Sequence, residues 1–243
     1  SLSFFKDRSS VKITLASLIK NLYFRDMNYS FNSSHKVAEF LLQIKAVSLR
    51  PEDPYKWASG WNSPIYCDNR KTLSYPRIRT FIRQEIVKTI DENFGRPDLI
   101  AGVATGGIAQ GALVAQEFGL PLIYVRPSAK AHGTQSQIEG VCESGQSVIL
   151  IEDLVSTGKS SLAAVDALRD AGCIVKGMVA VFSYGFDIAR KNFLDHKCPL
   201  VTITDYESIL SKAIETNFIQ ESDLESLNEW RTNPAEWNPQ IAK

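Results

Sequence analysis

The middle of the chain alternates short apolar runs with stretches of helical periodicity. The apolar runs have the length of buried strands, and several of them lead into apolar residues spaced three or four apart. Strands are expected at residues 98–104, 122–125, 148–151, 174–175 with 178–182, and 201–204. Helices are expected at 76–94, from the glycines at 106–107 to residue 118, and at 162–171. Because strands and helices alternate from residue 98 to 204, the pattern predicts an α/β fold with a mostly parallel sheet flanked by helices.

The two ends of the chain show weaker patterns. After Met27, the first methionine, a helix is expected with Ser33 or Ser34 as its cap, followed by turns and a short strand at 65–67. Two amphipathic helical patterns, 206–214 and 224–230, lie in the tail. We therefore expect four regions, namely a non-core extension (1–27), a small N-terminal region (28–75) that we call the hood, the core (76–205) and a helical tail (206–243). We hypothesise that Met27 is the natural start. A protein that begins at Met27 and fails to fold or loses activity would refute this hypothesis.

Composition and charge narrow the class of protein. The 243 residues are 44% hydrophobic and 22% charged, and 27 basic residues balance 27 acidic ones. Nucleic-acid binding usually requires a basic surface, and this sequence has no basic excess or basic run. It also has no apolar run long enough to span a membrane. The four cysteines are widely spaced without a C-x-x-C pair, which argues against a zinc site or disulfide framework and fits a reducing cytoplasm.

The most informative segment is V-I-L-I-E-D-L-V-S-T-G-K-S at residues 148–160. A strand here would deliver two carboxylates, Glu152 and Asp153, to the carboxyl edge of the sheet. The next turn opens a helix, and its backbone N–H groups form an anion site that comprises Ser156, Thr157, Gly158 and Ser160. Carboxylates suit the hydroxyls of a ribose and the turn suits its phosphate, so this segment can hold both ends of a ribose 5-phosphate. Lys159 either adds charge or points to solvent.

Two simpler interpretations of this segment are an ordinary structural turn and a nucleotide-binding loop. An ordinary βα turn with an acidic edge has similar residues. A nucleotide-triphosphatase loop is excluded by spacing, because the Walker pattern requires glycine where this chain has Asp153. The order and length of the whole segment instead resemble the phosphoribosyl-pyrophosphate signature of type I phosphoribosyltransferases.

Three further segments strengthen this resemblance. A-T-G-G-I at 104–108 is similar to the pyrophosphate-contacting loop of the same family, which involves Thr105, Gly106 and Gly107. The stretch S-G-W-N-S-P-I-Y, ending at Tyr66, resembles the element of orotate phosphoribosyltransferases that lies over the active site in the hood. Arg70 and Lys71 follow this element, and both are candidates to face the substrate.

The third segment is a polar stretch between Arg126 and Gly140. It has little apolar content and two glycines, so a mobile loop is expected. Its Arg126, Lys130 and His132 are similar to the R-x-x-x-K-x-H-G catalytic loop of orotate phosphoribosyltransferases. The chain departs from this family at Pro127, where many members carry a second lysine, and at Tyr184, near which many carry an arginine.

The resemblance implies a reaction and a set of roles. Ribose 5-phosphate would pass from phosphoribosyl pyrophosphate to N1 of orotate, with Mg²⁺ held by ribose and pyrophosphate oxygens and few protein ligands. Lys130, with Arg126 and His132, would stabilise the leaving pyrophosphate, while Glu152 and Asp153 would hold the ribose. The resemblance also implies a homodimer in which the mobile loop reaches the neighbouring subunit's site.

Two alternatives stay open at this stage. The first is a type I phosphoribosyltransferase that acts on a purine or uracil. The second is a non-catalytic regulator that senses phosphoribosyl pyrophosphate, although such regulators usually carry a basic DNA-reading domain. The residues that recognise the carboxylate of orotate are not identified by the sequence.

Overall fold

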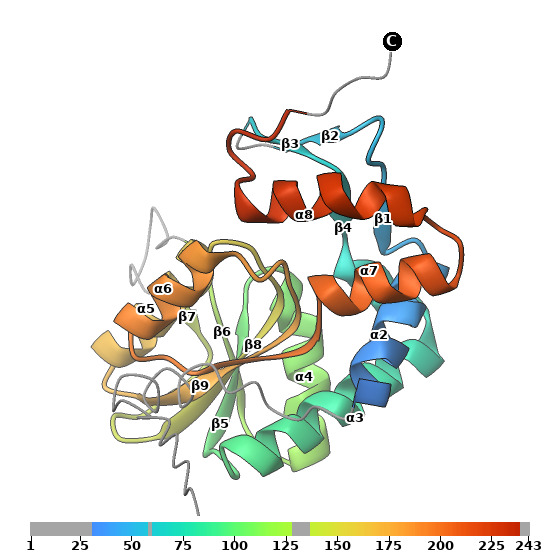
Figure 1. The fold of residues 1–243 in the computed structure, drawn as a ribbon. Coiled ribbons are helices and arrows are strands. Elements are labelled where there is room, and N and C mark those ends of the chain that lie inside the picture. The colour runs from blue at the N-terminus through green and yellow to red at the C-terminus, as the bar shows by residue number, and fades with distance from the viewer. Residues whose placement is uncertain (1–30, 58–59, 128–136, 239–243) are drawn as a thin grey trace, which may run out of the picture.

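The fold is that of a computed structural model, which describes residues 31–57, 60–127 and 137–238. Its centre is a six-stranded sheet in the order β10-β9-β8-β5-β6-β7 (Figure 1). Neighbouring strands are parallel, except that β7 pairs antiparallel with β6. The strands span Leu99–Val103 (β5), Leu122–Val125 (β6), Ile138–Glu139 (β7), Ser147–Val155 (β8), Ile174–Ser183 (β9) and Leu200–Asp205 (β10). The predicted α/β fold with a mostly parallel sheet is confirmed.

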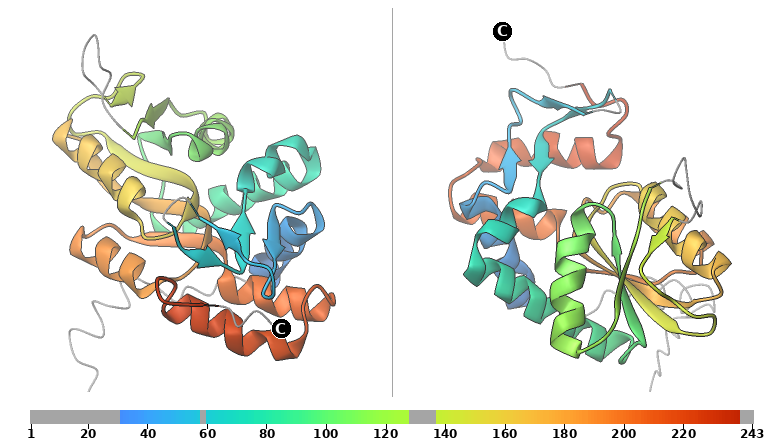
Figure 2. Two further views of the ribbon diagram at one scale, coloured as in Figure 1. Left: turned by 90° about the horizontal axis from the view of Figure 1, so that it is seen from above. Right: turned by 180° about the vertical axis from the view of Figure 1, so that it is seen from behind.

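Helices cover both faces of this sheet, as Figure 2 shows from behind. The helices α3 (Pro76–Asn93) and α4 (Gly106–Phe118) pack on one face, and α5 (Lys159–Asp170) and α6 (Asp187–Asp195) on the other. Alternate residues of β8 enter opposite cores, since Ile149 and Ile151 pack with the first pair of helices and Val148 and Leu150 with the second. Burial on both faces explains why β8 begins as a continuous aliphatic run.

Several predicted boundaries are confirmed and some are corrected. The helix expected at 76–94 is α3, and the strand expected at 122–125 is β6. Strand β8 continues to Val155 instead of ending before the two carboxylates. Helix α6 was not predicted, because its nine residues are largely polar.

The expected caps of the first described helix are wrong. Helix α2 spans Phe31–Gln43, so Ser33 and Ser34 lie inside it. The Ser34 hydroxyl is buried and lies 2.7 Å from that of Ser208 and 3.3 Å from that of Thr204. This serine therefore joins α2 to the C-terminal part of the chain instead of capping a helix.

A small hood packs beside the sheet and contains both ends of the described chain (Figure 1). Strand β1 (Val47–Leu49) pairs antiparallel with β4 (Ile65–Cys67), and β2 (Tyr55–Lys56) with β3 (Asn62–Ser63). The short helix η1 (Asn69–Ser74) follows β4. Two C-terminal helices, α7 (Tyr206–Glu215) and α8 (Leu224–Thr232), complete the unit with the short turn η2 (Glu221–Asp223) between them.

An aromatic cluster fixes α8 to the hood. The Trp230 ring is fully buried, and its centroid lies 5.6 Å from that of Trp57, 5.7 Å from Tyr184 and 5.3 Å from Phe186. Its indole N–H donates to the Asn62 carbonyl at 3.1 Å. The two helical patterns predicted in the tail are thus confirmed, and the second of them supports the hood strands.

No helix within the described part of the chain is long and apolar enough to cross a membrane. The expected N-terminal extension and Met27 lie outside the described residues.

Candidate active site

Two separately predicted loops meet at the carboxyl edge of the sheet. Strands β5 and β8 are parallel neighbours, so the turn that follows β5 lies beside the end of β8. A Cβ atom on Gly106 would overlap the carboxylate of Asp153, and one on Gly107 would overlap the Ile151 carbonyl. Only glycine permits this approach. The structure therefore brings the Thr105–Gly107 loop against the carboxylate that the sequence assigned to ribose binding.

The two adjacent carboxylates have different environments, because successive residues in a strand point to opposite faces. Asp153 is half-buried and faces the Gly106 loop. Glu152 is only 5% exposed, and its oxygens accept hydrogen bonds from the Asp153 backbone N–H at 3.0 Å and the Ser161 hydroxyl at 2.9 Å. Glu152 is thus directed toward α5, contrary to the expectation that both carboxylates face one ligand. It supports the turn, and Asp153 faces the site.

Burial raises the pKa of Glu152 well above its ordinary value of 4.5, and the nearby charge of Asp153 raises it further. Between pH 4.5 and this raised pKa the folded protein keeps a proton that the unfolded chain has lost. The stability that the neutral acid confers is complete below pH 4.5 and is lost as the pH rises through the folded-state pKa.

Glu152→Gln should therefore flatten the decline in stability that begins as the pH rises above 4.5. Glutamine cannot ionise, and its amide can still pair with Ser161 and the Asp153 N–H. Thermal melts at a series of pH values from 4.5 upward measure the slope. The exposed Glu225→Gln variant is the matched control and should keep the wild-type slope. An equally steep decline in Glu152→Gln would show that the titration of Glu152 does not cause it.

The predicted phosphate-binding turn joins β8 to α5. Gly158 caps α5 with a φ of +79°, and a Cβ there would overlap the Phe193 ring, so a side chain is excluded. Without a side chain, the cap leaves the N–H groups of the first helical turn to a ligand. The Asn192 amide donates to the Thr157 carbonyl at 2.9 Å and fixes the turn from α6. Ser160 and Lys159 are exposed, which places Lys159 toward solvent.

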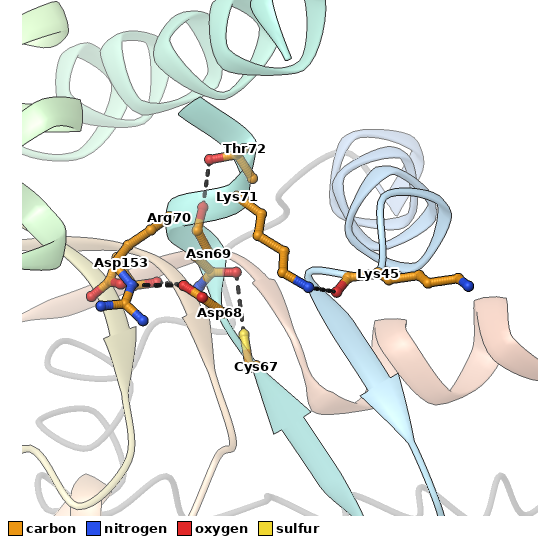
Figure 3. A network of polar contacts seen from close by, with 8 residues as sticks. All are labelled: Lys45, Cys67, Asp68, Asn69, Arg70, Lys71, Thr72 and Asp153. Atoms are coloured by element: carbon orange, nitrogen blue, oxygen red, sulfur yellow. Dashed lines mark hydrogen bonds and ion pairs between the residues drawn. The ribbon is translucent and has the colours of Figure 1, made fainter. Parts of the chain in front are cut away.

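The hood contacts this edge of the sheet through residues that follow β4 (Figure 3). The Asn69 amide is buried and donates to the Asp153 carbonyl at 2.5 Å, and the Cys67 thiol donates to the Asn69 side-chain oxygen at 3.2 Å. The charges of Asp153 and Asp68 add to burial in raising the pKa of that thiol. Sequence reasoning missed Asn69, because an asparagine after a strand also fits an ordinary turn.

Arg70 and Lys71 take opposite directions from η1. The Arg70 Nε donates to Asp68 at 2.7 Å, and Figure 3 draws its guanidinium on the Asp153 side of η1. The Lys71 ammonium donates to the Lys45 carbonyl at 2.8 Å and points away from the site. Of the two cations expected to face the substrate, the structure places one at the site.

The two tyrosines singled out in the sequence, Tyr66 and Tyr184, have different environments. Tyr66 is 45% exposed on β4, with its ring centroid 5.4 Å from that of Tyr55. Tyr184 is 3% exposed at the end of β9 and packs against Trp57 and Trp230. Burial raises the pKa of the Tyr184 phenol well above its ordinary value, so this side chain is neutral. Tyr66 is thus exposed on the hood, whereas Tyr184 belongs to the hood core.

Arg126 follows β6 at the same edge of the sheet. Its guanidinium lies 3.5 Å from the Glu139 carboxylate, and its backbone N–H donates to the Gln137 carbonyl at 2.8 Å. These contacts join the two ends of the polar loop. Lys130 and His132 lie outside the described residues, so their predicted roles rest on the sequence.

A glycine-capped turn that begins with a carboxylate and lies beside a second glycine loop, at the carboxyl edge of a parallel sheet, is the arrangement typical of type I phosphoribosyltransferases. The family described as "Phosphoribosyl transferase domain" matches residues 75–211. The orotate phosphoribosyltransferase of Bacteroides fragilis is 54% identical over 206 residues, which cover 85% of this chain and 97% of that protein. That of Listeria innocua is 48% identical over 202 residues, or 83% of this chain and 97% of that protein.

A solved structure agrees with these relatives. Orotate phosphoribosyltransferase from Aeropyrum pernix aligns with a TM-score of 0.66 at 28% identity, covering 76% of this chain and 99% of that one. The chain therefore belongs to the orotate phosphoribosyltransferases, within the type I phosphoribosyltransferase family.

Proposed function

We propose that this protein transfers ribose 5-phosphate from phosphoribosyl pyrophosphate to N1 of orotate, forming orotidine 5-monophosphate and pyrophosphate for pyrimidine synthesis. The observation that carries this proposal is the arrangement around Asp153, whose carboxylate lies against the Gly106 loop and begins the turn that leads to Gly158. The ribose, its pyrophosphate and its 5-phosphate then have adjacent sites. The names of the relatives support orotate as the acceptor.

The chemistry assigns a task to each part of the site. Breaking the bond between C1 of the ribose and pyrophosphate builds positive charge on the sugar and negative charge on the leaving oxygens. Asp153 would accept hydrogen bonds from the ribose hydroxyls and hold C1 in place. The N–H groups of the Gly158 turn, with the hydroxyls of Ser156, Thr157 and Ser160, would bind the 5-phosphate. Lys130, Arg126 and His132 would offset the charge on pyrophosphate.

Mg²⁺ fits this arrangement as an ion held mainly by the substrate. The described residues contain no group of three or more His, Cys, Asp or Glu side chains suited to a metal. Asp153, half-buried beside the glycine loop, would be the carboxylate that contacts such an ion. Such an ion, when bound, supplies positive charge to the leaving group. We place the reaction in the cytoplasm, in keeping with the unpaired cysteines.

We further propose a homodimer in which the loop containing Lys130 acts at the partner's site. Mixing Lys130→Ala with Asp153→Asn protein should then restore activity, because heterodimers contain one site with neither change. Random reassociation makes half of the dimers mixed, so about a quarter of the wild-type activity is expected. Activity that stays at the level of the separate variants would show that each subunit's site is self-contained.

One assay separates the proposed function from its alternatives. Loss of orotate absorbance on addition of phosphoribosyl pyrophosphate and Mg²⁺ is expected, with no comparable turnover of purine bases or uracil. Turnover of a purine or uracil instead would indicate a different phosphoribosyltransferase. Binding of phosphoribosyl pyrophosphate without turnover of any base would indicate a sensor.

A further inference from the structure

Arg70 is a cation at the site that has no role in the proposed transfer of ribose 5-phosphate. It stands on η1 directly after the hood strand β4, and its side chain is 59% exposed. Its hydrogen bond to Asp68 uses Nε, and the terminal amino groups make no hydrogen bond to the described residues. The preceding residue, Asn69, donates to the Asp153 carbonyl at 2.5 Å, and Figure 3 draws the guanidinium on the Asp153 side of η1. Arg70 is thus held at one nitrogen, while two others are available to a ligand.

The charges around Arg70 agree with this position. Its pKa is raised chiefly by the hydrogen bond to Asp68, with smaller contributions from Asp153 and Tyr66. The guanidinium therefore lies within electrostatic range of the carboxylate proposed to hold the ribose and of the exposed hood tyrosine. A ligand held by Asp153 therefore meets the positive charge of a guanidinium that Asp68 fixes in place.

The chemistry of orotate indicates what this charge can recognise. The carboxylate of orotate is on C6, next to N1, and N1 forms the bond to C1 of the ribose. In the product the carboxylate therefore lies close to the ribose carbon that bears the 2-hydroxyl. If Asp153 accepts a hydrogen bond from a ribose hydroxyl, a cation beside Asp153 stands close to the orotate carboxylate.

Among the described residues, the end of β9 supplies no comparable charge. Tyr184 occupies that position, and its ring is packed between Trp57 and Trp230. Its neutral phenol cannot form an ion pair with an anionic base. On the hood, Lys71 is committed to the Lys45 carbonyl and points away.

We propose that Arg70 recognises the carboxylate of orotate and so determines the specificity of this enzyme for an anionic pyrimidine. This inference rests on the proposed function and identifies a residue for it. Asp68 fixes the guanidinium through Nε, and the terminal nitrogens form a bidentate pair with the substrate carboxylate. The planar fork of arginine suits this pairing better than the single ammonium of lysine.

Orotidine 5-monophosphate and uridine 5-monophosphate provide a matched test, because they differ only in the C6 carboxylate. Their dissociation constants should be measured by titration calorimetry for the wild type, Arg70→Gln and Lys71→Gln. The wild type is expected to prefer orotidine 5-monophosphate by about 10- to 100-fold, the range for hydrogen bonds to a charged group. Arg70→Gln should reduce this ratio to near one while its affinity for uridine 5-monophosphate changes little. Lys71→Gln should keep the wild-type ratio.

The outcomes separate this inference from the proposed function. An unchanged ratio in Arg70→Gln would overturn the role of Arg70 and leave the proposed function intact. Equal loss of both nucleotides in Arg70→Gln would also overturn it, because the residue would then serve the hood or the ribose. A wild type without preference for the carboxylated nucleotide would likewise overturn the role of Arg70, and the orotate assay then decides the proposed function separately. In steady-state assays, Arg70→Gln should raise KM for orotate more than KM for phosphoribosyl pyrophosphate.

Discussion

Lys130→Ala is expected to lower kcat by about 10²–10³-fold while changing KM much less, the effect typical of losing one electrostatic donor. Negative charge accumulates on pyrophosphate only as its bond to C1 breaks, so a cation that meets this charge stabilises the transition state more than the bound substrate. Steady-state kinetics with both substrates varied measure the two parameters.

The control for this prediction is Lys88→Ala. Lys88 lies on α3 and is half exposed, with its ammonium 4.0 Å from Glu92, so its loss should leave kcat unchanged. An unchanged kcat in Lys130→Ala would remove the polar loop from the mechanism. A raised KM with normal kcat would limit Lys130 to substrate binding.

Asp153→Asn should lower kcat/KM for phosphoribosyl pyrophosphate by about 10²-fold or more, because charge-assisted hydrogen bonds contribute about 1.5–3 kcal/mol each. A ribose offers two hydroxyls to this carboxylate. Asparagine keeps the size of the side chain and so preserves the close contact with Gly106. The variant should therefore remain folded, and thermal melting checks this.

Asp170→Asn is the matched control for this second variant. Asp170 is exposed at the end of α5, away from the turn at its start, and its replacement should leave kcat/KM at the wild-type value. Intact turnover in Asp153→Asn would count against ribose binding by Asp153.

The core of the fold and the central turn were predictable because their signals are local. A buried parallel strand requires a continuous aliphatic run, and Val148 to Ile151 supply it before the polar turn begins. Gly158 follows the polar turn and is the N-cap of helix α5. These constraints act within a few residues, so the sequence pattern carries them directly.

The hood was less predictable because distant parts of the chain build it. The Trp230 indole bonds to a carbonyl 168 residues away, and Ser34 joins Ser208 across 174 residues. No local pattern indicates such pairs. The same limit explains why the two predicted helix caps are wrong, because Ser34 fits an N-cap in sequence but has tertiary partners in the structure.

Side-chain direction was the second limit on predicting the site. The sequence groups Glu152 with Asp153 as adjacent acids, but the continuation of β8 to Val155 sends them to opposite faces. Likewise, Arg70 and Lys71 are indistinguishable as neighbouring cations until η1 directs one to Asp153 and the other to Lys45. A shift of one residue along a strand or helix changes the direction of a side chain, and this direction decides which charge faces the substrate.

A crystal structure of the protein with orotidine 5-monophosphate is the most direct test of the proposed site. The 5-phosphate is predicted at the Ser156–Ser160 turn, with the ribose hydroxyls on Asp153 and the base beneath the hood. A nucleotide bound elsewhere, with this turn empty, would contradict the account.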